Sequence, residues 1–181
     1  MRKFLRTYGG LLIPVILLIG LDQLTKYLVE SRLAYGEIWA PWSWLTPYAR
    51  IIHWTNTGVA FGLFQGMGWI FSVFAIAISI AILYYFPKVE KADWAIRVAL
   101  VLEMAGAIGN MIDRLRINGA VLDFISVGNF PVFNVADSCI TVGVVFLAIG
   151  ILIQDQREKK KQSTPSESGE ASTSESSGKL D

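Results

Sequence analysis

The 181 residues carry a net charge of +1, and 53% of them are hydrophobic, with a mean hydropathy of +0.47. The balanced charge excludes a basic face for nucleic acid, and the hydropathy is high for a soluble protein. The single cysteine, Cys139, excludes an internal disulfide and a cysteine metal cluster, and the lone His53 excludes a histidine-rich metal site. We therefore expect no metal and no other cofactor.

Four apolar segments come close to the length that crosses a membrane as a helix, which is roughly 20 residues. They are Gly9–Leu28, Gly68–Phe86, Trp94–Ile112 and Ala136–Ile153. The alternative for any one of them is a buried helix in a large soluble core, but four such lengths together favour the membrane. The predicted fold class is an all-α membrane protein with four transmembrane helices.

The first segment also has the basic start and apolar run of a secretory signal peptide. The run is long, however, lacks a small-x-small cleavage site at its end, and contains Asp22 and Lys26. We interpret this segment as a helix that the protein retains.

Lysine and arginine, which favour the cytoplasmic ends of membrane helices, are unevenly distributed among the connections. One side of the predicted bundle has Arg2, Lys3, Arg6, Lys88, Lys91, Arg97, Arg157, Lys159, Lys160 and Lys161, and the other has only Arg32, Arg50, Arg114 and Arg116. This distribution predicts that both termini are cytoplasmic and that the loops 29–67 and 113–135 face outward.

The long outer loop is rich in tryptophan and tyrosine, which prefer the headgroup level of a membrane. These residues are Trp39, Trp42, Trp44, Tyr48 and Trp54. We expect the loop to lie on the membrane surface, with a strand at Ala49–Thr55 and the turn glycines of NTGVAFG contributing to a small sheet.

The carboxyl-terminal residues 162–181 are rich in Ser, Glu, Gly and Thr and nearly free of apolar side chains. Such a composition cannot bury enough surface to fold. The predicted organisation is therefore one membrane domain, residues 1–157, followed by a disordered cytoplasmic tail, residues 158–181.

Several polar side chains fall at one depth, near the outer ends of the predicted helices, where ionisable groups are candidates for function. They are Asp22, Lys26, Asn56, Asn110, Asp113, Asp123 and Asp137. Asp22 and Lys26 are spaced i, i+4, so they share a helix face and can neutralise each other. Each residue has a structural alternative, as a polar clamp between helices or as a helix cap. Glu103 lies deeper than the rest, and its role is open.

A pair of carboxyl groups is the simplest catalytic unit that these residues offer, because the sequence has no Ser–His or Cys–His set. Two close carboxyls do not both ionise easily, so one can activate a water molecule while the other protonates a carbonyl oxygen. Asp123 and Asp137 are joined by a turn-rich loop long enough to bring its ends together. At this point Asp113 is an equally good candidate, and the sequence does not say which carboxyl holds the shared proton.

The motifs DQLTK, NTGVAFG, GAIGNMIDR, LDFI and FNVADS follow one another in this order between about residues 15 and 150. In this order they resemble the lipoprotein signal peptidases, or signal peptidase II, of bacteria. The resemblance implies a four-helix aspartic peptidase of the bacterial cytoplasmic membrane, with its active site near the outer face. Its substrates are diacylglyceryl-modified prolipoproteins, which it cleaves on the N-terminal side of the lipidated cysteine.

The same resemblance assigns roles to individual residues. It makes Asp123 and Asp137 the catalytic pair and gives Asp113 a supporting role. The residues that line or support the site are Asp22, Lys26, Asn56, Gly109, Asn110, Asp113, Arg114, Asn134 and Ala136. It also implies a small extracytoplasmic sheet and a lid-like surface helix over the pair, contact with membrane lipids, and a monomer. Ala105 and Glu103 depart from the residues usual in the family.

Two other classes of protein remain to be weighed. A small transporter or proton relay predicts charged residues strung across the membrane and inverted repeats. An assembly factor predicts outer loops that bind partners and polar residues that only hold helices together. The gathering of charges at one face favours the peptidase.

Overall fold

The computed structural model describes residues 2–58 and 64–162 of the chain. Its four long helices are α1 (Arg2–Arg32), α2 (Gly68–Tyr85), α3 (Trp94–Arg116) and α4 (Val135–Gln162). All four are long and apolar enough to cross a membrane. The four predicted spans are thereby confirmed, although α1 and α4 extend several residues beyond their apolar segments because the flanking polar residues continue the helix.

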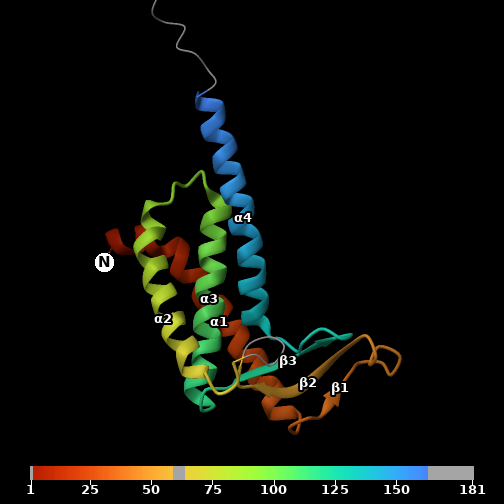
Figure 1. Ribbon diagram of the computed structural model, residues 1–181. Helices are drawn as coiled ribbons and strands as arrows, with labels where there is room; N and C mark the ends of the chain where they lie inside the picture. Colours follow the sequence, from red (N-terminus) through yellow and green to blue (C-terminus); the bar gives the residue numbers. More distant parts are fainter. Residues whose placement is uncertain (1, 59–63, 163–181) are drawn as a thin grey trace, which may run out of the picture.

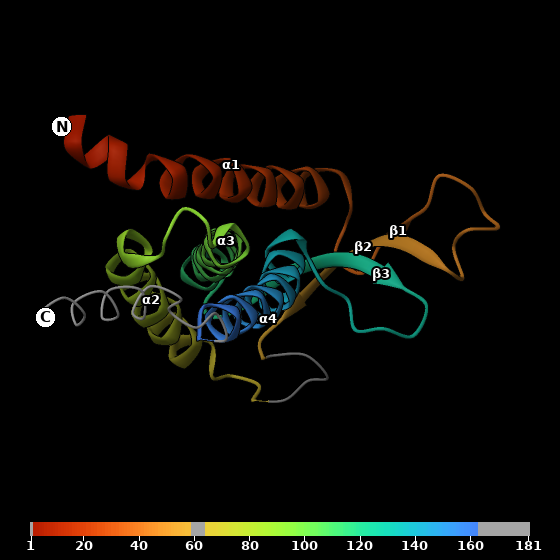
Figure 2. The same ribbon diagram turned by 90° about the horizontal axis from the view of Figure 1, so that it is seen from above.

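Helix α3 is the centre of the bundle. It packs against α1, α2 and α4, so it carries more buried residues than any other helix (Figures 1 and 2). The other three helices turn broad apolar faces outward, with side chains such as Ile16, Ile80 and Leu152 more than half exposed. Apolar side chains on the outside are what a helix in contact with lipid requires.

Glycine on α3 sets how closely α4 approaches. A Cβ atom at Gly106 would lie 2.5 Å from the Ala136 carbonyl oxygen and 2.6 Å from Ile140 Cγ1, so only hydrogen fits there. The small residues of AGAIG therefore allow a close approach between α3 and α4. The contact lies at the end of the bundle that is next to the sheet, where the polar residues gather.

A small antiparallel sheet lies beside the end of the bundle where α1 ends and α4 begins (Figure 1). Its strands are β1 (Ile38–Trp39), β2 (Ala49–Asn56) and β3 (Val121–Val127), in the order β1-β2-β3. The sheet and the strand β2 were predicted. Strand β3 was not, because the stretch between the two aspartates was interpreted as a turn-rich loop.

The sheet packs on the last turns of α1 through a compact apolar cluster. Leu122 and Phe124 of β3 contact Val29 of α1, and all three are buried. Side chains alternate between the two faces of a strand, so this packing turns Asp123, between Leu122 and Phe124, to the opposite face. The position of that carboxyl is thus set by its apolar neighbours.

Two connections join α2 to its neighbours in the chain. The 3-10 turn η2 (Phe86–Lys88) joins α2 to α3, and Arg97 holds it by donating to the carbonyl oxygens of Phe86 and Val89 at 3.4 and 2.9 Å. The connection from β2 to α2, at the end of the bundle next to the sheet, includes residues 59–63, which lie outside the described residues. Residues 163–181 of the predicted tail also lie outside them, whereas residues 158–162 continue α4. The described parts of that connection are bends and turns.

Candidate active site

A buried ion cluster ties α1 to α3. Lys26 Nζ of α1 lies 2.8 Å from Asp22 Oδ2, one turn earlier, and 2.9 Å from Asp113 Oδ2 of α3. All three side chains are at most 2% exposed, which is tolerable only because each charge has an opposite partner. Gln23 donates to Asp22 Oδ2 and to Asp113 Oδ1 at 3.0 and 3.2 Å.

The same carboxylates also fix the segments that carry the predicted catalytic pair. Asp113 Oδ2 accepts the Leu122 backbone N–H at 3.0 Å, directly before Asp123 in β3. Asp22 Oδ1 accepts the Ala136 N–H at 2.9 Å, directly before Asp137 in α4. The ion cluster therefore supports β3 and the start of α4 and fixes their positions.

Gly109 leaves room for the buried ion cluster. A Cβ atom there would lie 2.9 Å from Asp22 Oδ2 and 3.1 Å from the Ala136 side chain. Contacts of that length force neighbouring groups apart, and the Asp22 carboxylate is held by its own bonds. A larger residue at this position would push α1 or α4 away from α3.

Two asparagines link Asp123 to Asp137. Asn134 Nδ2 donates to Asp123 Oδ1 at 2.8 Å and to Asn110 Oδ1 at 3.1 Å, and Asn110 Nδ2 donates to Asp137 Oδ1 at 2.7 Å. Asn110 Oδ1 also accepts from Lys26 Nζ at 3.3 Å. Because the Asn110 oxygen faces two donors, its amide nitrogen must face Asp137, so the direction of this bond is fixed.

Asp137 is also part of the cap of α4. Asn134 precedes the helix, and its Oδ1 accepts the Asp137 N–H at 2.9 Å, while Asp137 Oδ2 accepts the Asn134 N–H at 3.2 Å. This reciprocal pair is a capping box with Asp in place of the usual Glu. The helix N-terminus favours a negative charge at this position. The structural alternative for Asp137, a helix cap, is thus real, and it coexists with the hydrogen bond from Asn110.

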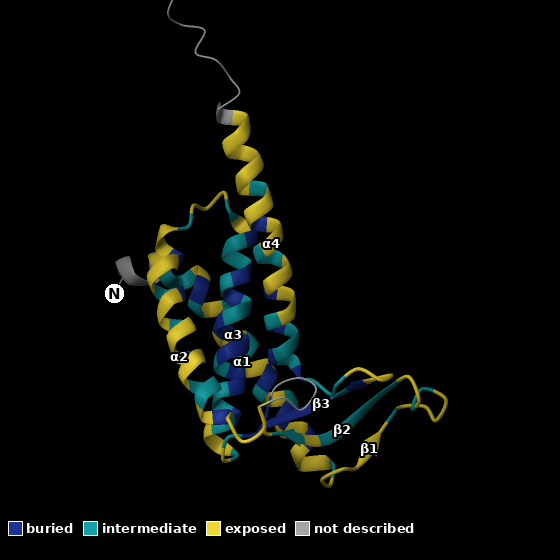
Figure 3. Cartoon of the chain, viewed as in Figure 1, coloured by how far each residue is buried: buried dark blue, intermediate teal, exposed yellow. Residues whose placement is uncertain are grey.

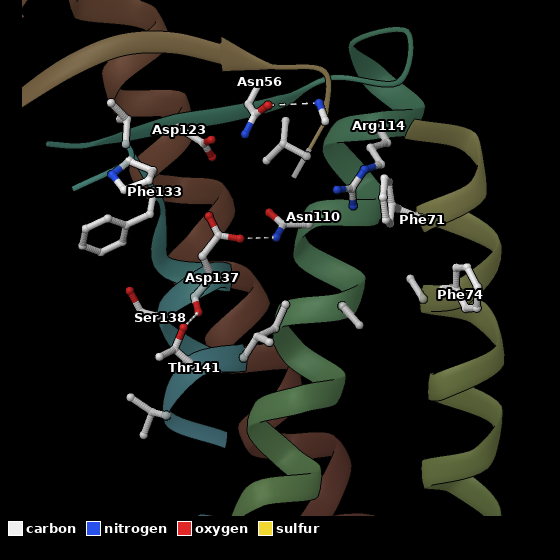
Figure 4. A pocket seen from close by; sticks show the side chains of 18 of the residues that line it. Asn56, Phe71, Phe74, Asn110, Arg114, Asp123, Phe133, Asp137, Ser138 and Thr141 are labelled. Atoms are coloured by element: carbon white, nitrogen blue, oxygen red, sulfur yellow. Dashed lines mark hydrogen bonds between the residues drawn. The ribbon is translucent and has the colours of Figure 1, made fainter. Parts of the chain in front are cut away.

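Asp123 and Asp137 line one cavity of about 610 Å³ (Figure 4). Its polar end also includes Asn56 and Arg114, and the Arg114 guanidinium lies 5.3 Å from the centre of the Phe71 ring. The rest of the wall is mostly apolar and comes from α2, α3, α4 and the loop before α4: Phe71, Phe74, Ala75, Ile78, Ala107, Phe130, Phe133, Ile140, Thr141 and Val142. The cavity therefore combines an acidic end with an apolar groove between membrane helices.

Burial, followed by the nearby charge of Asp137, raises the pKa of Asp123 to about 7. Hydrogen bonds from Asn56 and Asn134 and the charge of Lys26 act against this rise. The side chain is 3% exposed, so loss of hydration is a sufficient cause. Asp123 can consequently hold a proton at neutral pH, which the first step of carboxyl-pair hydrolysis needs.

The sequence-predicted residues occupy three places. Asp123 and Asp137 lie in the cavity, and Asn56 and Arg114 line it beside them. Asn110 and Asn134 bridge the pair. Behind the cavity lies the ion cluster with the residues packed against it: Asp22, Lys26, Gly109, Asp113 and Ala136. Asp113, the rival candidate, is fully buried, bound to Lys26, and absent from the cavity wall.

Gln23 and the aromatic residues of the cavity wall were not predicted. Gln23 lies inside the DQLTK motif beside a buried aspartate, which was a usable signal. Phe71 and Phe74 gave none, because apolar residues on a membrane helix face lipid as often as they face a groove.

Glu103 lies apart from these groups. Its Oε1 atom is buried without a hydrogen-bond partner and lies near Gly143 of α4, where a Cβ would be 3.0 Å away. Among the residues that the structure describes, no group of three or more His, Cys, Asp or Glu is arranged to hold a metal ion.

Comparison with known proteins identifies related chains. A sequence profile described as "Signal peptidase (SPase) II" matches residues 14–153. The lipoprotein signal peptidase of Shouchella clausii is 40% identical over 149 residues, which cover 82% of this chain and 96% of that protein. The lipoprotein signal peptidase of Bacillus subtilis is 38% identical over 154 residues, covering 81% and 96%. A solved structure of a bacterial membrane enzyme, 33% identical, superposes with a TM-score of 0.74 over 84% of this chain and 93% of its own.

Proposed function

Because this chain belongs to the signal peptidase II family, we propose that Asp123 and Asp137 are the catalytic pair of an aspartic endopeptidase that removes lipoprotein signal peptides. Its substrates are diacylglyceryl-modified prolipoproteins, and it cuts on the N-terminal side of the lipidated cysteine. One observation supports the pair above all: two acids from different elements line one cavity and are linked through the side chains of Asn110 and Asn134.

The hydrogen bonds suggest a division of labour between the two acids. Asp137 accepts from Asn110 Nδ2 and from the Asn134 N–H, and it sits at a helix N-terminus, so its charged form is well supported. Asp123 is more deeply buried, which favours its protonated form. In our proposal Asp137 is the base and Asp123 the acid at the start of the reaction.

Hydrolysis then proceeds in two steps. Asp137 takes a proton from water while the water oxygen bonds to the scissile carbonyl carbon, and Asp123 gives its proton to the carbonyl oxygen. The resulting gem-diol collapses as the C–N bond breaks: Asp137 gives its proton to the leaving nitrogen, and Asp123 takes one from a hydroxyl group. The products are a carboxylic acid and an amine, and both acids return to their starting states.

The apolar part of the cavity suits the substrate. A signal peptide is an apolar helix, and the lipid on the cysteine is apolar too, so both fit a groove lined by Phe71, Phe74 and Ile78 of α2. Entry from the side, between helices, avoids moving these groups through water. Arg114, beside Phe71, is placed to meet the substrate backbone at the polar end of the groove.

The topology that we propose follows from the lysine and arginine distribution. Both termini lie in the cytoplasm and the active site lies near the outer face of the bacterial membrane. The three-stranded sheet is then extracytoplasmic, and a surface helix in the outer loops covers the pair. We propose that residues 1–157 form the catalytic domain, that residues 158–181 are a dispensable tail, and that the enzyme works as a monomer among membrane lipids.

The direct test is incubation of the purified protein with a diacylglyceryl-modified prolipoprotein, followed by mass analysis of the new N-terminus. We expect cleavage immediately before the modified cysteine. Asp123→Asn and Asp137→Asn should each abolish cleavage with the fold intact, whereas Asp155→Asn, at an exposed pair at the far end of α4, should leave it unchanged. Normal turnover by either site variant would rule out the pair.

A further inference from the structure

The hairpin formed by residues 35–54, here called the aromatic arm, exposes an unusual amount of aromatic surface. Its exposed aromatic side chains are Tyr35, Trp39, Trp42, Trp44, Tyr48 and Trp54, with Trp44 66% and Tyr48 68% accessible. Soluble surfaces rarely gather such residues, and a contiguous apolar patch indicates a partner. The arm's aromatic rings therefore need an explanation beyond folding.

The rings of the arm meet one another rather than a core. Trp42 stacks on Trp44 with centroids 5.9 Å apart, and Tyr35 stacks on Trp54 at 5.5 Å. Backbone groups at the tip bond within the tip: the Leu45 N–H donates to the Trp42 carbonyl at 3.0 Å, and the Tyr48 N–H to the Leu45 carbonyl at 2.8 Å. These bonds satisfy part of the polar backbone of the tip, which lowers the cost of entering the interfacial layer of a bilayer.

The arm projects sideways from the end of the helical bundle, so its tip stands clear of the helices (Figures 1 and 2). It begins just after Arg32, where α1 ends, and the outward face of α1 leading up to it exposes Leu24, Tyr27 and Leu28. Figure 3 shows exposed residues running from that helix onto the hairpin. The exposed surface of a membrane-crossing helix thus continues onto the arm.

The charge pattern indicates which partner the arm meets. Residues 38–49 contain no Asp, Glu, Lys or Arg, so an anionic or cationic partner has nothing to pair with at the tip. Tryptophan and tyrosine at the outer end of a membrane helix are the residues that settle at the headgroup level. We propose that the aromatic arm is a membrane-interface anchor whose tip, around Trp42 and Trp44, inserts into the headgroup layer of the bilayer beside α1.

Such an anchor has a consequence for the acidic cavity. In the register of the sheet, Trp54 of the arm lies directly opposite Asp123 of β3. The strand that carries the anchor is therefore bonded to the strand that carries the carboxyl. By holding the arm at the interface, the bilayer fixes the depth of Asp123 relative to water, independently of whether that residue is catalytic.

The experiment places one fluorescent label at a time on the full chain in phosphatidylcholine vesicles. Cys139→Ala removes the buried native thiol, and Ser43→Cys then puts a label between the two tryptophans. Ile16→Cys, on the exposed face of α1, is the lipid reference, and Glu158→Cys, at the far end of α4, is the water reference. Quenching is measured with headgroup-level nitroxide lipids and with aqueous iodide, without any substrate.

We expect the label at residue 43 to be quenched by headgroup nitroxides severalfold more than the label at residue 158, and by iodide severalfold less. Adding Trp42→Ser and Trp44→Ser should greatly reduce both differences, whereas Trp69→Ser, on exposed α2, should change neither. Iodide quenching equal to that at residue 158 would overturn the proposal. Shielding that appears only with added prolipoprotein, or that grows with protein density in the membrane, would overturn it in favour of a polypeptide partner or a second copy.

Discussion

Replacing Lys26 with methionine tests the ion cluster behind the cavity. The substitution keeps the length of the side chain and removes the only cation among the described residues that pairs with Asp22 and Asp113, whose carboxylates stay buried. Breaking a buried pair from one side costs roughly 3–5 kcal/mol, because an uncompensated charge remains. Each carboxylate keeps a backbone N–H and a bond from Gln23, so we expect the lower end, about 3 kcal/mol.

That loss corresponds to an unfolding equilibrium constant about 100-fold larger. The assay is unfolding of the purified protein in mixed micelles with increasing SDS, followed by tryptophan fluorescence. Adding Asp22→Asn and Asp113→Asn to Lys26→Met removes the unpaired charges, so the triple variant should regain much of the lost stability.

The chain provides a matched control for this change. Lys159 and Asp155 have the same i, i+4 spacing and a 2.7 Å contact, but their side chains are 73% and 53% exposed. Exposed pairs contribute at most about 1 kcal/mol, so Lys159→Met should be nearly silent. If Lys26→Met cost no more than Lys159→Met, or if the triple variant were less stable than the single one, the reasoning about buried charge would be refuted.

Three further changes address the cavity and the membrane interior. Asn110→Ala removes the side-chain donor to Asp137. A hydrogen bond to a charged group is worth about 1.5–3 kcal/mol, so kcat/KM for a lipidated precursor should fall about 10- to 150-fold. An unchanged kcat/KM would exclude this bond from catalysis. Because burial raises the pKa of Asp123 from 3.8 to about 7, its proton favours the folded state at low pH, and that contribution to stability is lost as pH rises through about 7. Cleavage should fall over the same range in a pH profile from 5 to 9, and a rate still rising at pH 9 would contradict a protonated Asp123. Glu103→Leu removes a buried oxygen without a partner, so thermal unfolding in detergent should shift upward or stay level with activity intact, and a clear loss of either would show that the carboxyl has a role.

The helices were predictable because hydropathy and length decide them in a membrane protein. The depth of the polar residues was predictable for the same reason, since it follows from where each lies along its span. The strand β3 escaped prediction because the loop interpretation rested on Gly128, Asn129 and Pro131, which follow VLDFISV. Burial of Leu122 and Phe124 against α1 supports the strand.

The pairing of charges could not be deduced from spacing alone. Sequence spacing gave Asp22 a partner in Lys26, but it could not show that the same Lys26 also holds Asp113, 87 positions later, because that contact depends on how α1 crosses α3. The bond from Asn134 to Asn110 was not predictable either, because it depends on how α4 packs against α3. The resemblance to a family supplied these residues as a set, and the structure supplies the bonds among them.

Asn134 meets two opposite demands with one short side chain. Its oxygen must accept the first-turn N–H of α4, while its nitrogen must give hydrogens toward Asp123 and its neighbours. Aspartate has the reach but no hydrogen to give, serine has a single hydrogen and a shorter reach, and glutamine is one carbon too long. The position therefore accepts one residue type, and fraying of the first turn of α4 would disconnect the two acids at the same moment.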